Sequence, residues 1–314
     1  MDDKTKKIVL ARQRADRFRA IPMAAGILLT APVIHSDKIA YGPEGHQYFL
    51  FFKPDTPVKD RLAVYIHAGG WSSYSPAEFE FICRRFSQRG YPVVSLGYRH
   101  APRYRYPAQA HDVFRGFIKA REYVKQQGYN ADNIIVIGSS AGGHLGGVLV
   151  YDRELQAQYA VKQEWFLGLA SLGGIMDFSF EYPDATEKLF DNLFTEDYNR
   201  ALAAPLNMVK GDEGVRVMCI HSPLDPISNI DNQRAFVRRV NELSPGSATM
   251  VEVREKNRYH CNLVAGGFFL NGTIPRRLKR FLPLWSRSDG AARKPLRRCC
   301  PRSLRRARRS GGLP

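Results

Sequence analysis

The chain has 314 residues, of which 44% are hydrophobic and 25% are charged, so it is long enough for one large globular domain and too apolar to be disordered throughout. The formal net charge of +17 is concentrated at the ends: +4 lies in residues 1–20 and +9 in residues 286–314, which leaves +4 for residues 21–285. The body is therefore only mildly basic, which argues against a dedicated nucleic-acid-binding domain.

Cysteine usage and apolar segments bear on the cellular compartment. The five cysteines are odd in number, no pair has metal-ligand spacing, and Cys299 and Cys300 are adjacent, so we expect no disulfide framework. The apolar stretch 21–34 contains Pro22 and Pro32 and is shorter than the roughly 20 residues of a membrane helix. No clear cleavage site follows it. The sequence predicts a cytoplasmic protein without a membrane span.

Seven apolar runs predict β-strands, namely Gln47–Phe52, Leu62–His67, Pro92–Tyr98, Asn133–Gly138, Phe166–Leu172, Val215–His221 and Thr249–Val253. The run Ile134–Ile137 is continuously apolar, which is typical of a strand covered on both faces of a parallel sheet. Helical patterns lie at Ala77–Arg89, Pro107–Gln127, Ile230–Glu242 and Thr273–Leu284. Strands that alternate with helices predict an α/β fold with a mostly parallel sheet.

Residues 286–314 differ from the rest of the chain. They include nine arginines and almost no large apolar side chain, so they lack the apolar surface needed to fold. We expect a basic, disordered tail and exclude it from the fold. Such a tail has the charge to bind polyanions, although like-charge runs usually remain solvated.

The strongest chemical signal is the motif Gly138-Ser139-Ser140-Ala141-Gly142, which follows an apolar strand and opens a helix near Ala141. A nucleophilic serine must be exposed on a tight turn where a base reaches it, and the flanking glycines allow the backbone to turn without side-chain clashes. The helix N-terminus behind the turn favours developing negative charge. This strand, serine and helix arrangement predicts Ser140 as a nucleophile.

A second signal is the motif His67-Ala68-Gly69-Gly70-Trp71, directly after the strand Leu62–His67. Acyl transfer requires backbone N–H groups that stabilise an oxyanion, and glycines allow those groups to approach the substrate. The alternative is a simple Gly-Gly turn. Its place after a strand and upstream of the serine favours an oxyanion loop.

Together, the segments 67–71, 97–102 and 138–145 resemble the carboxylesterase group of α/β-hydrolases. This group includes hormone-sensitive-lipase-like, kynurenine-formamidase-like and feruloyl-esterase-like enzymes. The segment 173–177 is also similar to one found in that group, and the resemblance covers roughly residues 40–282. It implies the α/β-hydrolase fold and a serine hydrolase, without fixing a substrate.

The resemblance also implies the donors of the oxyanion hole. The family usually has glycine where this chain has Ala68, but its next two glycines match Gly69 and Gly70. The third donor would be the N–H group of Ala141.

The acid and the base of such an enzyme follow the serine in the order acid, then histidine. Asp225 is similar to the acid of the family's His-Gly-x-x-Asp loop, with Ser222 in place of the glycine. Its rivals are Asp212, which precedes the strand, and Asp231, for which helix capping is the alternative role. The last histidine of the chain, His260, follows the last predicted strand, as the base should.

The other histidines within motifs, His67, His144 and His221, are interpreted as local hydrogen-bonding groups. Trp71 either lines an acyl pocket or belongs to the core. The aromatic-rich segment Asp177–Asn207 either forms a small lid or packs on the sheet.

We therefore expect three parts: residues 1–39 as an N-terminal segment that partly covers the active site, 40–285 as the catalytic α/β-hydrolase domain with a small lid, and 286–314 as the tail. The predicted function is hydrolysis of small or short-acyl carboxylic esters by Ser140, Asp225 and His260. No cofactor, metal or specific nucleic-acid partner is expected. The alternatives are an arylformamidase or other amidase with the same triad, and a non-catalytic binding protein on a hydrolase scaffold.

Overall fold

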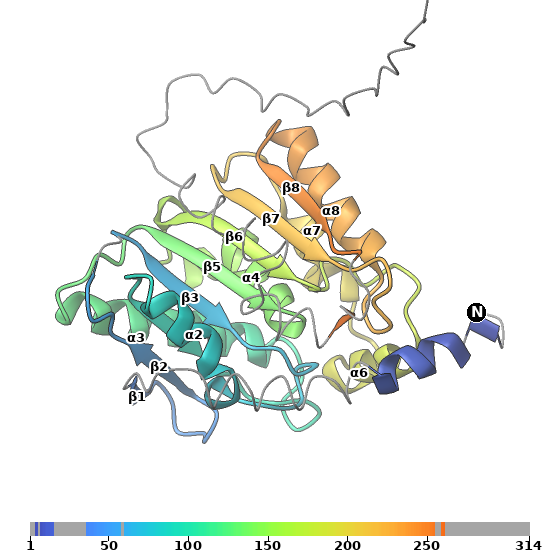
Figure 1. The fold of residues 1–314 in the computed structure, drawn as a ribbon, viewed down its shortest axis with the longest axis horizontal. Coiled ribbons are helices and arrows are strands. Elements are labelled where there is room, and N and C mark those ends of the chain that lie inside the picture. The colour runs from blue at the N-terminus through green and yellow to red at the C-terminus, as the bar shows by residue number, and fades with distance from the viewer. Residues whose placement is uncertain (1–3, 6, 16–35, 58–59, 255–258, 261–314) are drawn as a thin grey trace, which may run out of the picture.

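An eight-stranded sheet forms the centre of the computed structural model, which describes residues 4–5, 7–15, 36–57, 60–254 and 259–260 (Figure 1). The strand order is β1-β2-β4-β3-β5-β6-β7-β8. The strands are β1 (Ser36–Ala40), β2 (Tyr48–Phe52), β3 (Leu62–Ile66), β4 (Val93–Leu96), β5 (Ile134–Ser139), β6 (Phe166–Leu172), β7 (Arg216–His221) and β8 (Ala248–Glu252). Strand β2 is antiparallel to both β1 and β4, and all other neighbouring strands are parallel.

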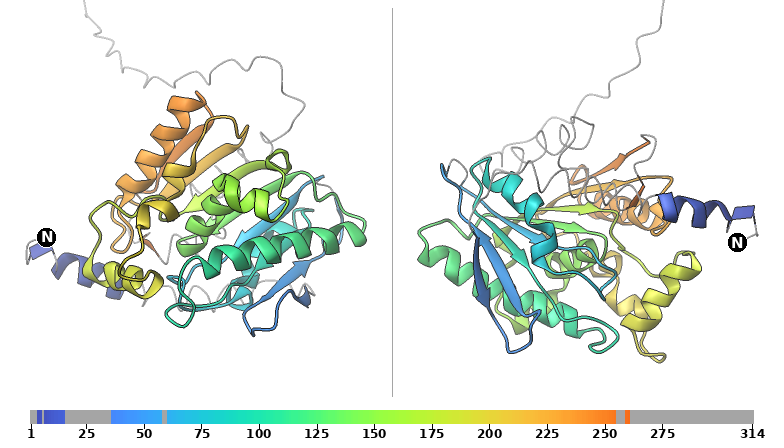
Figure 2. Two further views of the ribbon diagram at one scale, coloured as in Figure 1. Left: turned by 180° about the vertical axis from the view of Figure 1, so that it is seen from behind. Right: turned by 60° about the horizontal axis from the view of Figure 1, so that its bottom comes forward.

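The helices of the described chain cover both faces of this sheet (Figure 2). They are η1 (Pro76–Phe79), α2 (Glu80–Ser87), α3 (Ala108–Gln126), α4 (Ala141–Tyr151), α5 (Arg153–Gln158), η2 (Gln163–Trp165), α6 (Asp184–Leu193), η3 (Arg200–Ala203), α7 (Pro205–Met208) and α8 (Ile230–Leu243). Residues 4–5 and 7–15 are also helical.

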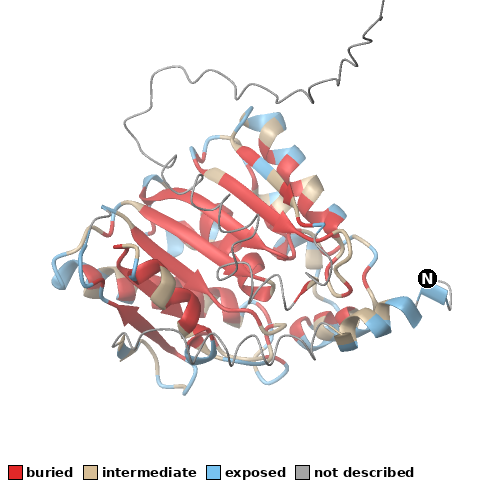
Figure 3. Ribbon diagram, in the orientation of Figure 1, coloured by how far each residue is buried: buried red, intermediate tan, exposed pale blue. Residues whose placement is uncertain are grey.

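Two apolar cores lie on opposite faces of the sheet. Along β2, Phe49 and Phe51 join the core that includes the apolar side chains of α3, α4 and α8, whereas Leu50 and Phe52 join the core that includes those of α2. This alternation follows from the two-residue period of a strand. Strands β2 to β7 are buried over most of their length (Figure 3), as their apolar sequences predict, whereas only Ala248 and Val251 are buried in β8.

The predicted α/β fold and all seven predicted strands are confirmed, with ends that differ by at most two residues. The additional strand β1 was not predicted, because it is a largely exposed edge strand with the sequence SDKIA and no apolar run. The predicted helix Ala77–Arg89 begins with the separate turn η1. The predicted helix Thr273–Leu284, the stretch 21–34 and the tail 286–314 lie outside the described residues.

The sheet changes winding direction between β3 and β5. From β3 the chain continues to β4 on one side, whereas β5, β6, β7 and β8 follow in order on the other side. Such a switch point opens a crevice at the carboxyl ends of the strands, where ligands bind in open α/β sheets. The predicted oxyanion loop follows β3 and the predicted nucleophile follows β5, so both lie at this crevice.

Two further observations concern the cysteines and the possibility of a membrane-spanning helix. Cys83 and Cys219 are buried free thiols, and burial raises the pKa of both. Within the described ranges, no helix combines the length and the apolarity needed to cross a bilayer.

Candidate active site

Ser140 occupies the turn that joins β5 to α4. Its backbone has φ 52° and ψ −119°, a conformation that residues other than glycine rarely adopt. A Cβ atom on Gly138 would lie 2.2 Å from the carbonyl oxygen of Gly142, and one on Gly142 would lie 2.1 Å from that of Ile66. The turn therefore requires glycine at both positions. The main-chain N–H of Ser140 donates to the carbonyl oxygen of Leu172 at 2.8 Å, which anchors the turn to β6.

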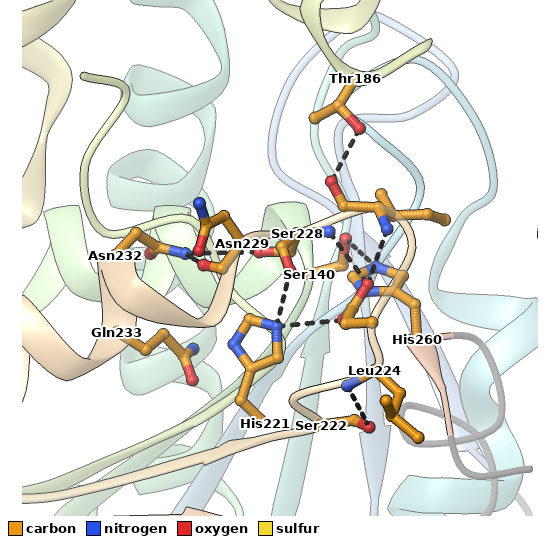
Figure 4. A network of polar contacts seen from close by, with 12 residues as sticks. Ser140, Thr186, His221, Ser222, Leu224, Ser228, Asn229, Asn232, Gln233 and His260 are labelled. Carbon is orange, nitrogen blue, oxygen red and sulfur yellow. Dashed lines mark hydrogen bonds and ion pairs between the residues drawn. The ribbon is translucent and has the colours of Figure 1, made fainter. Parts of the chain in front are cut away.

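The three residues predicted to carry the chemistry come together at the ends of β5, β7 and β8 (Figure 4). His260 Nε2 lies 2.8 Å from Ser140 Oγ, and His260 Nδ1 lies 2.7 Å from Asp225 Oδ2. The side chains of His260 and Asp225 are 6% and 1% exposed, whereas Ser140 is half-buried. Ser140 is thus more accessible than the side chains of His260 and Asp225, which lie in the interior.

The carboxylate of Asp225 accepts three hydrogen bonds and has one further polar contact. Its Oδ1 accepts from the main-chain N–H groups of Ile227 at 2.8 Å and Ser228 at 2.9 Å, and its Oδ2 accepts from His260 Nδ1. The second contact of Oδ2 is His221 Nε2 at 3.1 Å. Burial raises the pKa of Asp225, but the two imidazoles outweigh it and hold that pKa well below its usual range. The buried carboxylate is therefore ionised at neutral pH.

The predicted oxyanion loop is a tight turn after β3. Gly69 and Gly70 have φ values of 134° and 55°, and the carbonyl oxygen of Gly69 accepts from the N–H groups of Ser72 and Ser73 at 3.1 Å each. Within the described chain, the N–H groups of Gly69, Gly70 and Ala141 donate to no protein acceptor. Their use in an oxyanion hole remains a prediction, and these donors are available for it.

Trp71 belongs to the core, which is the second of its two predicted roles. It is 2% exposed, and its indole Nε1–H donates to His144 Nδ1 at 3.1 Å. His144 Nε2 in turn donates to the carbonyl oxygen of Ala203 at 2.9 Å. Burial lowers the pKa of His144 to about 4, so its ring is neutral and Nδ1 is free to accept. His144 is thus a local hydrogen-bonding group, as predicted.

The segment Asp177–Asn207 contains α6, η3 and most of α7. Of its aromatic rings, Phe178 and Phe190 pack on Trp71 in the loop after β3 and belong to the same apolar core as residues of the sheet. A Cβ atom on Gly70 would lie 2.9 Å from Leu189 Cδ1, which places α6 against the oxyanion loop.

The same segment is tied to the loop after β7. Thr186 Oγ1 donates to the carbonyl oxygen of Ile227 at 2.8 Å, and Asn229 Nδ2 donates to that of Glu181 at 3.0 Å. Helix α6 therefore bridges the predicted oxyanion loop and the loop that holds Asp225.

Neither rival carboxylate contacts His260. Asp212 lies before β7, with its side chain 75% exposed and 2.7 Å from Arg153. Asp231 lies in the first turn of α8 and pairs with Arg234 at 2.9 Å. The predicted capping role of Asp231 is wrong, because the side chain of Asn229 caps the helix by accepting from the N–H of Asp231.

Two residues near the Asp225–His260 pair received no specific role from the sequence. His221 was interpreted only as a local hydrogen-bonding group, and its Nε2 contacts Asp225. Gly173 has φ 58°, and a Cβ atom there would lie 3.2 Å from His260 Nδ1. Two features of the sequence could have indicated these residues. His221 lies four residues before Asp225, and a Gly-Gly pair directly follows β6.

Comparisons with known proteins agree with this architecture. A family model described as alpha/beta hydrolase fold matches residues 63–204. The chain is similar to Esterase LipC of Mycobacterium tuberculosis, with 24% identity over 74% of this chain and 61% of that protein. It is also similar to an arylesterase of Saccharolobus solfataricus, with 32% identity over 38% of this chain and 41% of that protein. The chain thus spans less than two thirds of the length of either relative.

Among solved structures, esterase B of Lactobacillus rhamnosis superimposes with a TM-score of 0.70 and 20% identity, over 90% of this chain and 95% of that one. At this identity the likeness establishes the fold. The parallel sheet with its switch point, the serine turn after β5 and the family model that matches residues 63–204 show that the chain has the α/β-hydrolase fold.

Proposed function

We propose that the protein is a serine carboxylic-ester hydrolase that acts on small, short-acyl esters. The observation that carries the proposal is the continuous hydrogen-bonded chain from Ser140 Oγ through His260 to the buried carboxylate of Asp225, with links of 2.8 Å and 2.7 Å. The names of the similar proteins, esterase and arylesterase, support the same chemistry.

In the proposed mechanism, His260 Nε2 accepts the hydroxyl proton while Ser140 Oγ attacks the ester carbonyl carbon. The C–O bond of the ester then breaks, and the alcohol leaves with the proton from His260. Water attacks the acyl-enzyme by the same route and releases the acid. The N–H groups of Gly69, Gly70 and Ala141 would stabilise the oxyanion in both steps.

The electrostatics of the site suit this cycle. The ionised carboxylate of Asp225 holds Nδ1–H of His260, which leaves Nε2 unprotonated and aimed at Ser140. The same carboxylate stabilises the imidazolium that forms during attack. The left-handed backbone of Ser140 keeps its hydroxyl at the crevice throughout.

The preference for short acyl groups rests on the position of α6. Leu189 lies against Gly70, one of the proposed oxyanion donors, and α6 is fixed to the loop of Asp225 through Thr186. Because the side chain next to the reacting carbonyl is branched and held in place, a long or bulky acyl chain would collide with it.

The test is hydrolysis of p-nitrophenyl acetate and butyrate by the purified chain and by Ser140→Ala. We expect the variant to lose about 10⁴-fold or more in kcat/KM with an unchanged circular dichroism spectrum. An alkylphosphonate should attach to Ser140 and not to the neighbouring Ser139, as peptide mapping would show.

The outcome also separates the alternatives. Faster turnover of N-formylkynurenine than of any ester would replace the proposal with a formamidase. A wild-type chain that neither turns over esters nor accepts the phosphonate would point to a binding protein on a hydrolase scaffold.

A further inference from the structure

We infer that His221 is a positioning residue that shares the catalytic carboxylate with His260 and thereby sets the pH range of the reaction. The inference rests on the proposed function and assigns a role to a histidine that does not touch substrate. His221 is the last residue of β7 and is fully buried, and its ring lies beside Ser228 (Figure 4).

The contacts of His221 fix which ring nitrogen carries its proton. Nε2 lies 3.0 Å from the carbonyl oxygen of Ser228 and 3.1 Å from Asp225 Oδ2, and both atoms only accept hydrogen bonds. Nε2 must therefore be the donor. Within the described chain, Nδ1 has no hydrogen-bond partner, as suits a nitrogen that carries no proton.

His221 competes with His260 for a single oxygen. Both imidazoles place a ring nitrogen near Asp225 Oδ2, His260 Nδ1 at 2.7 Å and His221 Nε2 at 3.1 Å, while Oδ1 is already occupied by two main-chain N–H groups. Among the described residues, these two histidines are the titratable groups that face the carboxylate. The polar Nε2–H group of His221, 3.1 Å from Oδ2, partly offsets the negative charge there, so this oxygen stabilises the imidazolium of His260 less than an unshared oxygen would.

The consequence is a wider working range at low pH. A carboxylate that interacts with His260 alone would hold the base protonated to higher pH, and protonated His260 cannot accept the serine proton. By sharing Asp225, His221 keeps His260 neutral at a lower pH. Its bond to Ser228 also fixes the loop that carries the acid, so loss of the ring would affect both orientation and protonation.

The experiment compares His221→Gln with His221→Leu in the full chain, by the dependence of kcat/KM on pH for a soluble p-nitrophenyl ester. The amide nitrogen of glutamine reaches the place of Nε2 and keeps the donor, whereas leucine fills the ring's space without one. We expect leucine to move the acidic limb to higher pH by roughly half to one unit, and glutamine to restore the limb of the wild type.

A purely structural role would lower the rate at every pH by one factor and leave the limb in place. An unmoved limb in a folded His221→Leu variant would therefore overturn the inference, as would a glutamine variant with the same shifted limb as leucine.

A second measurement needs no leucine variant and covers the case in which it fails to fold. Nitrogen NMR of the wild type labelled in histidine should show His221 protonated at Nε2 and unprotonated at Nδ1 near pH 8, with the resonance assigned by its loss in His221→Gln. A proton on Nδ1 would overturn the inference. An inactive wild-type chain would overturn the proposed function, and the tautomer would still test the contact with Asp225.

Discussion

The nucleophile turn and the pair of loops that hold Asp225 and His260 reach the same crevice by different physical means. The turn spans five consecutive residues, and its shape is stored in the backbone: a left-handed Ser140 between glycines that admit no Cβ atom. Asp225 and His260 are 35 residues apart and follow separate strands. Their geometry depends on side-chain hydrogen bonds and on the pairing of β7 with β8. Backbone sterics therefore fix the position of Ser140, the proposed nucleophile, and a polar network fixes its proposed partners.

Gly142→Ala is the most severe test of the backbone side of this comparison. A Cβ atom there would lie 2.1 Å from the carbonyl oxygen of Ile66 and cannot be relieved by a rotamer change. We expect loss of about 3 kcal/mol or more in the free energy of unfolding and of more than about 99% of the esterase activity. Denaturant unfolding and ester hydrolysis measure the two effects. Gly45→Ala is the control, because a Cβ atom at Gly45 meets nothing within 4 Å; equal effects of both changes would refute the steric argument.

Asp225→Asn tests the polar network while leaving the backbone turn intact. The amide nitrogen facing His260 would favour the wrong imidazole tautomer, so we expect kcat to fall about 10²- to 10⁴-fold with little change in secondary structure. Asp212→Asn and Asp231→Asn are matched controls, since those side chains pair with Arg153 and Arg234 on the surface. If either control is crippled while Asp225→Asn keeps the wild-type rate, the assignment of the acid is wrong.

The pH dependence of the rate tests the polar network separately from the serine turn, because the turn contains no group that titrates between pH 5 and 9. Proton uptake by His260 removes the base, so kcat/KM should fall tenfold per pH unit below the imidazole pKa, whose reference value is about 6.5. Asp225 stays ionised through this range, since its pKa is held well below the usual value. Rates between pH 5 and 9 give the profile; a rate that stays constant down to pH 5 would exclude an imidazole base.

Stability must be followed over the same range to separate inhibition from unfolding. Burial lowers the pKa of His67 to about 3 and that of His144 to about 4, so the unfolded chain binds more protons below about 6.5 and unfolding becomes easier as the pH falls. Asp225 affects the free energy of unfolding only at lower pH. Its stabilising contribution is fully present above its unfolded pKa of about 3.9 and is lost as the pH falls through its pKa in the folded state. Recovery of activity on return to pH 8 would show that the acidic limb of the rate profile reports catalysis and not loss of the fold.

Leu189→Ala gives the smallest expected effect and tests the helix that bridges the two regions. Removing the branched side chain beside Gly70 should raise the ratio of octanoate to acetate hydrolysis about threefold to tenfold, with little change for acetate. Kinetics on a series of p-nitrophenyl esters give this ratio. Leu202→Ala is the control, since Leu202 is 67% exposed on η3; no change in the ratio for Leu189→Ala would place the acyl group elsewhere.

Much of the fold was readable from the chain because its signals are local. A continuously apolar run such as Ile134–Ile137 predicts a doubly covered strand, and the alternation with helices predicts crossovers. The edge strand β1 escaped prediction because it buries almost nothing. The sequence suggests Asp231 as the N-cap of α8, whereas Asn229 occupies that position in the structure. Both residue types cap helices, and only the course of the chain distinguishes them.

For the candidate site, the sequence by itself determined the serine turn, since its glycines are demanded by backbone contacts within a few residues and one neighbouring strand. It also indicated the order of acid and base through the resemblance to a family. Only the tertiary structure decided that the indole of Trp71 lies in the core, that Leu189 meets Gly70, and that a second histidine shares Asp225. These facts depend on distances between side chains far apart in the chain, which the folded sheet sets and a linear pattern does not encode.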